Sequence, residues 1–195
     1  QRLAIALFSL WLALLTAITA LQAPVWGNAE LMTALWVKER PLSLRAAQDV
    51  AKHRYDSGQP QAALDGLMQA YDGGIRQADL PMAALLVKCW NPAVRTSRNL
   101  LQESTQAIRT SSYSNSVLAS LLLLRQAAQE NVCPGAIDQT QWLALTEALL
   151  ASPKFRAVAE QHIRVERAKL FIHRRDLDLT MAELEKSYMV GPSVE

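Results

Sequence analysis

The chain has 195 residues, of which 50% are hydrophobic and 19% are charged, and its net charge is +2. This length allows one domain with a core, or one domain with an appendage. So small a net charge argues against a nucleic-acid-binding protein, which needs a clustered basic patch. The charged fraction is below the roughly 25% usual for soluble domains. Much of the deficit lies near the N-terminus, because residues 3–29 carry no charge.

The first predicted element is the apolar segment LAIALFSLWLALLTAITAL, residues 3–21. As a helix it spans roughly 28 Å, close to the hydrocarbon thickness of a bilayer. A helix satisfies its own backbone hydrogen bonds, and hydroxyl side chains can bond to carbonyls one turn earlier. We therefore predict a transmembrane helix over residues 1–24. The alternatives are a signal peptide, for which ALQA at 20–23 is an acceptable cleavage site, and a buried core helix, which usually has a polar stripe.

The flanking residues indicate an orientation for this helix. Arg2 precedes the segment, and the next basic residue is Lys38. The positive-inside rule then places the N-terminus in the cytoplasm and residues 25–195 in the periplasm or outside the cell. Trp26 is expected in the headgroup layer, because an indole keeps its N–H in water and its ring in lipid. Membrane lipid is thus expected around residues 3–26.

Two antiparallel helices are predicted next, over residues 44–56 and 59–71. Ser43 is the expected N-cap of the first helix, and Gly58 supplies the turn between them. Small Ala51 would lie at the close contact between the helices. One face of the second helix, at i, i+4 and i+7 spacing, consists of Ala63, Leu67 and Ala70. This arrangement is typical of the tetratricopeptide repeat of about 34 residues.

Residues 167–192 repeat this pattern in a weaker form. Ala168 takes the close-contact position and Phe171 the aromatic position. Leu184 would fill the gap to a following pair, and Pro192 would end the unit. A helical stretch over residues 28–41, which ends at Pro41, precedes the first pair. We predict that it is the second helix of a degenerate first repeat. Trp36 in this stretch would then pack against the first full pair.

The centre of the chain is less regular. Helices are predicted over residues 80–90, 93–108, 115–130 and 139–152, separated by prolines. About ten helices are expected after the membrane span, each too short and amphipathic to stand alone. The predicted fold is therefore all-α: a transmembrane helix, then a tetratricopeptide-like α-solenoid of antiparallel helix pairs over residues 25–195, irregular in its centre and truncated at its C-terminus.

The two cysteines, Cys89 and Cys133, are the only ones in the chain. In an oxidising compartment they can form a disulfide. It would close a loop of about 45 residues and contribute about 4 kcal/mol in the chain-entropy description. The alternative is two separate buried thiols.

No arrangement of residues indicates catalysis. His53, His162 and His173 lack the spacing of a metal site, and no nucleophile elbow, phosphate loop or nucleotide-binding glycine pattern is present. Residues 174–178, RRDLD, are expected to form a turn between helices. The hydroxyl-rich residues 102–116 are expected to form a helix end, a loop and the next N-cap, with a sugar- or peptide-binding loop as the alternative. We predict no catalytic residue, cofactor or metal in this segment.

One stretch carries a family resemblance. After the apolar span, the residues that carry it are Val25, Trp26, Leu35, Trp36, Pro41, Ser43, Arg45, Ala46 and Gly58. With the helix pair that follows, they resemble the C-terminal part of bacterial multi-spanning membrane proteins that join a C-type glycosyltransferase-like region to a periplasmic tetratricopeptide tail. These proteins are similar in layout to the eukaryotic transmembrane-and-tetratricopeptide O-mannosyltransferases. The two cysteines around an irregular centre are similar to one bacterial branch.

The resemblance implies a piece of a longer protein of the bacterial inner membrane, with the repeat domain in the periplasm. In such proteins the catalytic loop lies in the multi-span region, so no catalytic residue is carried over, and whether the parent protein transfers a sugar is left open. The leading hypothesis is a membrane-tethered scaffold that binds a protein or peptide partner, such as a glycosylation acceptor. The alternatives are an assembly factor for pili or other envelope machinery, and a domain that binds lipid-linked sugar near Trp26, Trp36, Lys38 and Arg40.

Overall fold

The computed structural model of the chain describes residues 2–133 and 135–190, and the predicted all-α fold is confirmed there. This part of the chain contains ten helices and no strand. The helices are α1 (Arg2–Trp26), α2 (Ala29–Glu39), α3 (Leu44–Asp56), α4 (Pro60–Asp72), α5 (Asp79–Trp90), α6 (Leu100–Thr110), α7 (Asn115–Gln129), α8 (Gln139–Ala151), α9 (Pro153–His173) and α10 (Leu177–Val190).

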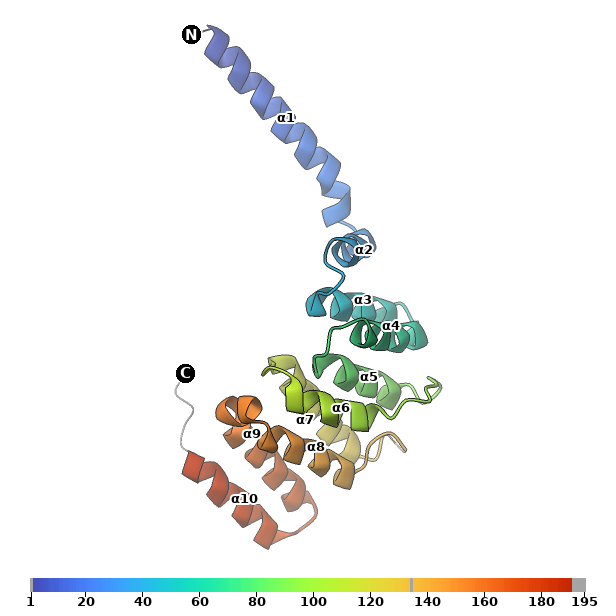
Figure 1. Cartoon of the computed structure of the whole chain (residues 1–195), viewed down its shortest axis with the longest axis vertical. Coiled ribbons are helices and arrows are strands. Elements are labelled where there is room, and N and C mark those ends of the chain that lie inside the picture. The colour runs from blue at the N-terminus through green and yellow to red at the C-terminus, as the bar shows by residue number, and fades with distance from the viewer. Residues whose placement is uncertain (1, 134, 191–195) are drawn as a thin grey trace.

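Helix α1 projects as a rod from one end of a stack formed by the other helices (Figure 1). Helix α2 lies crosswise at the base of the rod, and α3 to α10 follow in order away from it. Helix α3 packs on α4, α4 on α5, and α9 on α10. The centre is interleaved instead: α5 packs on both α6 and α7, while α6 packs on α8.

One hydrophobic core runs through the stack from α3 to α9. Its largest fully buried side chain is Trp142 of α8, whose indole N–H donates to the Leu121 carbonyl of α7 at 2.9 Å. A buried indole needs such a partner, because an unpaired polar group in a core costs roughly 1–3 kcal/mol. This hydrogen bond joins α7 and α8 in the centre of the stack, where the helices interleave instead of packing in sequential pairs.

The local signals around the first helix pair are confirmed. Helix α3 covers residues 44–56 as predicted, and its N-cap Ser43 accepts a hydrogen bond from the Ala46 N–H at 3.3 Å. Gly58 has a φ of +74°, a left-handed conformation that glycine adopts without a Cβ clash. Helix α4 follows two residues later, one residue later at each end than the range predicted for it.

The predicted helix over residues 93–108 is wrong in its first half. Residues 91–99 form a loop, and α6 begins at Leu100 after the N-cap Asn99. The side chain of Gln61 binds this loop, because it donates to the Arg95 carbonyl at 3.1 Å and accepts from the Arg95 N–H at 2.9 Å. The Gln61 side chain on α4 thus satisfies the backbone N–H and carbonyl of Arg95, which would otherwise form hydrogen bonds within a helix. Nine helices, rather than about ten, follow α1 in the described residues.

A network of ion pairs joins α9 to α10. Glu160, which is 6% exposed, pairs with Arg156 at 2.8 Å and with Arg164 at 2.6 Å. Arg164 also pairs with Glu183 of α10 at 3.2 Å. Burial alone would raise the pKa of Glu160, but the hydrogen bonds from Arg156 and Arg164 outweigh it and lower that pKa.

The network predicts an acid-sensitive stability. The pKa of Glu160 is lower in the folded chain than in the unfolded chain. Its ionised carboxylate therefore stabilises the fold at a pH above the unfolded-state pKa. This stabilisation is lost as the pH falls through the folded-state pKa. We expect Glu160→Gln to lower the free energy of unfolding by roughly 1–3 kcal/mol at neutral pH. The variant should also lose less stability than the unaltered chain on acidification to about pH 3–4.

Thermal unfolding followed by circular dichroism at both pH values measures this. Glu185→Gln is the matched control, since Glu185 lies on α10 with an exposed side chain. Equal losses on acidification for both variants and the unaltered chain would contradict the assignment of this acid sensitivity to Glu160.

Candidate membrane-proximal site

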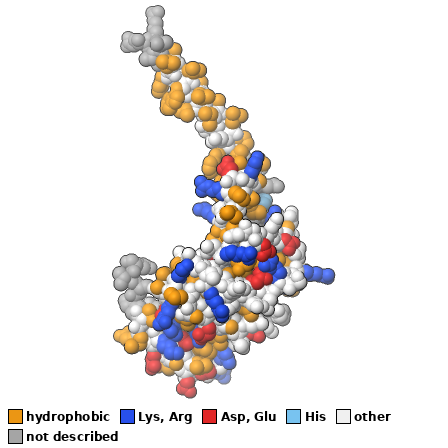
Figure 2. Space-filling model, viewed as in Figure 1, with side chains coloured by type: hydrophobic (Ala, Val, Ile, Leu, Met, Phe, Trp, Pro, Cys, Tyr) orange, Lys and Arg blue, Asp and Glu red, His pale blue; other side chains and the backbone are white. Residues whose placement is uncertain are grey.

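Helix α1 is long and apolar enough to cross a bilayer. Within its segment Ile5–Trp26, the most apolar 18-residue window has a mean hydropathy of 2.0, and none of that window is buried. The hydroxyls of Thr16 and Thr19 donate to carbonyls one turn earlier, at 2.8 and 2.9 Å, as predicted. The rod is apolar over its visible face, whereas charged side chains are spread over the stack (Figure 2). Its exposure excludes the alternative of a core helix within the described fold.

A short elbow connects α1 to α2. Trp26, the last residue of α1, is 67% exposed, and Gly27 and Asn28 make the turn. The Gly27 N–H donates to the Ala23 carbonyl at 3.0 Å, and the Asn28 side chain accepts from the Leu31 N–H at 3.1 Å. The Asn28 side chain therefore caps α2, and the chain turns through a large angle within two residues (Figure 1).

Helix α2 is poorly covered by the rest of the chain. It packs only on α1 and α3, and none of its described side chains is buried. Trp36 is half-buried, while Leu31, Leu35 and Val37 are 51%, 40% and 40% exposed. Much of the apolar surface of α2 thus meets solvent within this chain.

A cleft of about 360 Å³ opens between the end of α2, α3 and α4. Arg40 and Arg54 are its only charged lining residues. The side chain of Arg54 extends from α3 to α4, where its guanidinium donates to the Ala62 carbonyl at 3.1 Å. Gly66 makes room for it, because a Cβ at that position would stand 2.5 Å from the Arg54 guanidinium. The other lining residues are mainly small or apolar: Val37, Pro41, Leu42, Ser43, Ala46, Ala47, Val50, Gly66, Gln69, Ala70 and Gly73.

A second hollow, of about 480 Å³, lies beside the first. Trp36, Arg40 and Arg45 line it, together with Glu39, Ser43 and Ala46. Of the four residues predicted to form an aromatic and basic patch, Trp36 and Arg40 come together here. Trp26 and Lys38 do not line this hollow.

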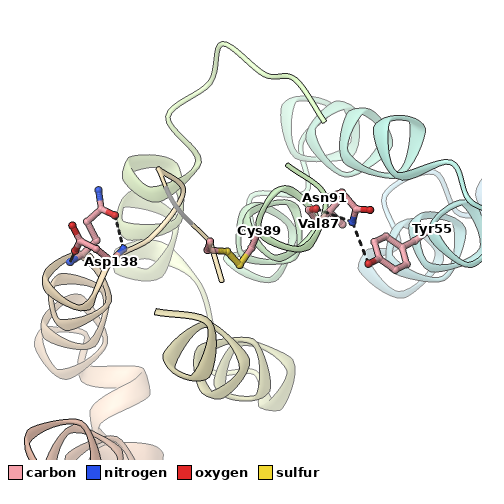
Figure 3. Close-up of a disulfide and its surroundings, with 7 residues drawn as sticks. Tyr55, Val87, Cys89, Asn91 and Asp138 are labelled. Carbon is pink, nitrogen blue, oxygen red and sulfur yellow. Dashed lines mark hydrogen bonds between the residues drawn. A yellow bond between two sulfur atoms is a disulfide. The ribbon is translucent and has the colours of Figure 1, made fainter. Parts of the chain in front are cut away.

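The two cysteines form a disulfide in the centre of the stack (Figure 3). Cys89 lies near the end of α5 and Cys133 in the loop before α8, with their Cα atoms 4.8 Å apart and a sequence separation of 44. Both are almost fully buried. Two residues further on, the Asn91 side-chain amide donates to the Tyr55 hydroxyl at 3.1 Å, which connects the same end of α5 to α3.

The residues predicted to pack between repeats lie mostly in the core. Ala51, Ala63 and Leu67 are buried, and Ala70 is half-buried and lines the cleft. Ala168 and Phe171 of α9 are buried as well, at 1% and 4% exposure. Leu184 is 39% exposed, because in the described part of the chain α10 has only α9 as a neighbour. The predicted end of the unit, Pro192, lies outside the described residues.

Sequence reasoning missed an exposed stripe on α10. Leu177, Met181, Leu184 and Tyr188 recur at i, i+4, i+7 and i+11, and their exposed fractions are 71%, 56%, 39% and 85%. This spacing places them on one face of the helix, and it was readable in the sequence. Their exposure was not, because it depends on which helices pack on α10. We call these four residues the α10 stripe.

One buried polar cluster outside these surfaces has a structural role. Asp79, which is 2% exposed, accepts hydrogen bonds from the hydroxyls of Ser114, at 2.5 Å, and Ser116. The bonds join the start of α5 to the start of α7. The hydroxyl-rich residues 102–116 indeed form a helix end, a loop and the N-cap Ser114, as predicted. Within the described residues, no three or more His, Cys, Asp or Glu side chains could hold a metal ion together.

Comparison with protein families, with curated proteins and with solved structures finds no match for this chain.

The disulfide predicts a large redox effect on stability. Because it closes a loop of 44 residues, the Cys89→Ala, Cys133→Ala double variant should lose about 4 kcal/mol of unfolding free energy. Thermal unfolding with and without reductant measures this. Reductant should lower the melting temperature of the unaltered chain and leave that of the double variant unchanged. Thiol labelling would verify that the reductant has reduced both cysteines. An unchanged melting temperature of the unaltered chain under those conditions would contradict the stabilising role of the disulfide.

Proposed function

We propose that this chain is a membrane-tethered helical-repeat scaffold that faces the periplasm and binds a protein partner. The observation that carries the tether is the exposure of α1, whose most apolar window is nowhere buried and whose length matches the thickness of a bilayer. The transmembrane helix would comprise residues 1–24 and the repeat domain residues 25–195.

The repeat part of the proposal is a tetratricopeptide-like solenoid with an irregular centre. Its support is the sequential packing of α3 on α4 and of α9 on α10, with small Ala51, Ala63 and Ala168 buried. The turn at Gly58 and the helix lengths suit such pairs. Stacked pairs of this kind are commonly used for protein–protein interaction, because they expose long surfaces.

The disulfide supports the periplasmic orientation, since disulfides persist in oxidising compartments and are rare in the cytosol. Arg2 before the span agrees with it. Lys38, Arg40 and Arg45 follow the span within 20 residues, and positive-inside counting on them favours the opposite side. The disulfide outweighs this count, because a structural disulfide rarely persists in a reducing compartment.

The α10 stripe supports the interaction role. A contiguous patch of exposed apolar side chains often marks an interaction surface, whereas single exposed apolar residues are normal on any protein. Within the stack, faces with this spacing are covered by a neighbouring helix, as α5 covers α4. A helix of a protein partner therefore fits the stripe. That the partner is a glycosylation acceptor, or that the parent protein transfers sugar, has only the family resemblance in its support.

A second candidate function is a contribution to binding lipid-linked sugar. The hollow lined by Trp36, Arg40 and Arg45 favours it, because an aromatic ring and guanidinium groups suit a sugar ring and a phosphate. A third candidate is an assembly factor for envelope machinery. Identification of the bound protein as an envelope-assembly component would distinguish it from the scaffold and from the sugar-binding domain.

The tether and its orientation predict an outcome in a bacterial cell. We expect the uncleaved chain to stay in the membrane fraction after a carbonate wash, and alkaline phosphatase fused after Val190 to be active, since that enzyme requires an oxidising compartment. Fusion of green fluorescent protein at the same place is the reciprocal control. A soluble, shortened chain would identify α1 as a signal peptide, and an inactive phosphatase would place the domain in the cytoplasm.

The scaffold role predicts contact at the α10 stripe. A photo-crosslinking amino acid in place of Met181 should give adducts with one discrete protein in living cells, at least about fivefold more than at Lys186. Lys186 is a matched control, since it is exposed on the same helix but away from the stripe. Tyr188→Asp should weaken the adduct, because it places a charge in an apolar contact. Equal yields at both positions would contradict an interaction through this stripe.

A further inference from the structure

Helix α2 has an apolar surface that the proposed scaffold does not use. It is an eleven-residue helix with no buried described side chain, and isolated helices of this length are marginal in water. Leu31 and Leu35, one turn apart on the same face, are 51% and 40% exposed. The rest of the described chain leaves this face uncovered.

The elbow limits how far α2 can lie from the end of α1. Three Cα steps separate Trp26 from Ala29, so these Cα atoms are at most about 11 Å apart. The headgroup layer on each side of a bilayer is roughly 5–8 Å thick. If Trp26 lies at the boundary of the hydrocarbon core, the first turn of α2 is held in this layer or at its outer edge.

The crosswise direction of α2 keeps the rest of it at the same depth. In Figure 1, α1 runs in the plane of the view while α2 is seen nearly end-on. A helix of eleven residues is roughly 16 Å long, and one that lies across α1 runs along the membrane surface over that whole length. A helix continuing the line of α1 would instead have left the headgroup layer within its first turns.

The side chains of α2 fit such a location. Leu31 and Leu35 offer an apolar face, and Trp26 at the elbow is an interfacial residue type. Lys38 and Arg40 are exposed at the other end, where their stems can lie along lipid while their charges reach phosphate groups. Figure 2 shows basic side chains gathered where the apolar rod meets the stack.

We infer that α2 is an interfacial helix whose Leu31–Leu35 face binds the phospholipid headgroup layer of the membrane that α1 crosses. This inference rests on the proposed membrane span. Because α3 packs on another side of α2, the bound helix holds the stack in one orientation, with α10 at the end furthest from the membrane. The lipid surface is therefore a second point of attachment, and it limits the swivel of the domain about the elbow.

Depth-dependent fluorescence quenching tests this on the full chain. Both native cysteines are in the disulfide, so a single introduced cysteine is the only reactive thiol. Ile18→Cys, Leu35→Cys and Lys186→Cys are each labelled in detergent with an environment-sensitive maleimide dye. The labelled chains are then reconstituted in vesicles of phosphatidylcholine and phosphatidylglycerol that carry a quencher either on the headgroup or deep in the acyl chain.

We expect the deep quencher to act on the dye at Ile18 in the centre of α1, and the headgroup quencher to act on the dye at Leu35. Neither should act on the dye at Lys186. In the Leu35→Cys background, Leu31→Asp should reduce headgroup quenching about twofold or more, because it places a charge on the immersed face. In the Ile18→Cys background, the same Leu31→Asp change should leave deep quenching unaffected.

The outcomes separate the inference from the proposed span. Quenching at Ile18 without quenching at Leu35 would overturn the interfacial role of α2 and leave the tether intact. Quenching at Leu35 that ignores Leu31→Asp would also overturn it, since proximity alone would then explain the signal. Absence of quenching at Ile18 would overturn the membrane span itself.

Discussion

The uncovered apolar surface of α1 is the constraint on which the rest of this structure depends. Burial of one Leu or Ile side chain is worth roughly 1.5–3 kcal/mol, and along Ile5–Trp26 the most apolar window has none of its residues buried. Folding of the described chain therefore leaves this surface in need of an apolar solvent. A bilayer provides one without breaking the helix's own hydrogen bonds. In the proposed membrane setting the short elbow would hold α2 at the membrane surface, and α2 would in turn orient the stack.

The stack itself is held by different interactions along its length. The first pair, α3 and α4, depends on small residues such as Ala51 and Ala63 at a close helix contact. In the centre the helices interleave, and there the disulfide and the Trp142 hydrogen bond join segments distant in sequence. At the far end, ion pairs around Glu160 and Glu183 connect α9 to α10. The disulfide and the Trp142 hydrogen bond thus occur where regular helix pairing is weakest, whereas the ion pairs reinforce a closely packed helix pair.

The signals that predicted correctly were those whose physics is local. Ser43 caps α3 and Gly58 turns the chain because a hydroxyl and a missing Cβ act within a few residues. The first part of the helix predicted over residues 93–108 is wrong because Gln61, more than 30 residues earlier, binds the backbone of Arg95. No local pattern carries that information. Likewise the spacing of the α10 stripe was visible in the sequence, but its exposure depends on which helices pack nearby.

The sequence by itself determined the all-helical class, the apolar span and most helix boundaries in the first pair, since hydrophobic periodicity, capping and chain length act through near neighbours. Only the tertiary structure decided that Cys89 meets Cys133, that Trp36 shares a hollow with Arg40, and that α2 lies across α1 with its leucines uncovered. These features depend on contacts between residues far apart in the chain, or on the angle at a two-residue elbow. Neither leaves a periodic trace in the order of the amino acids.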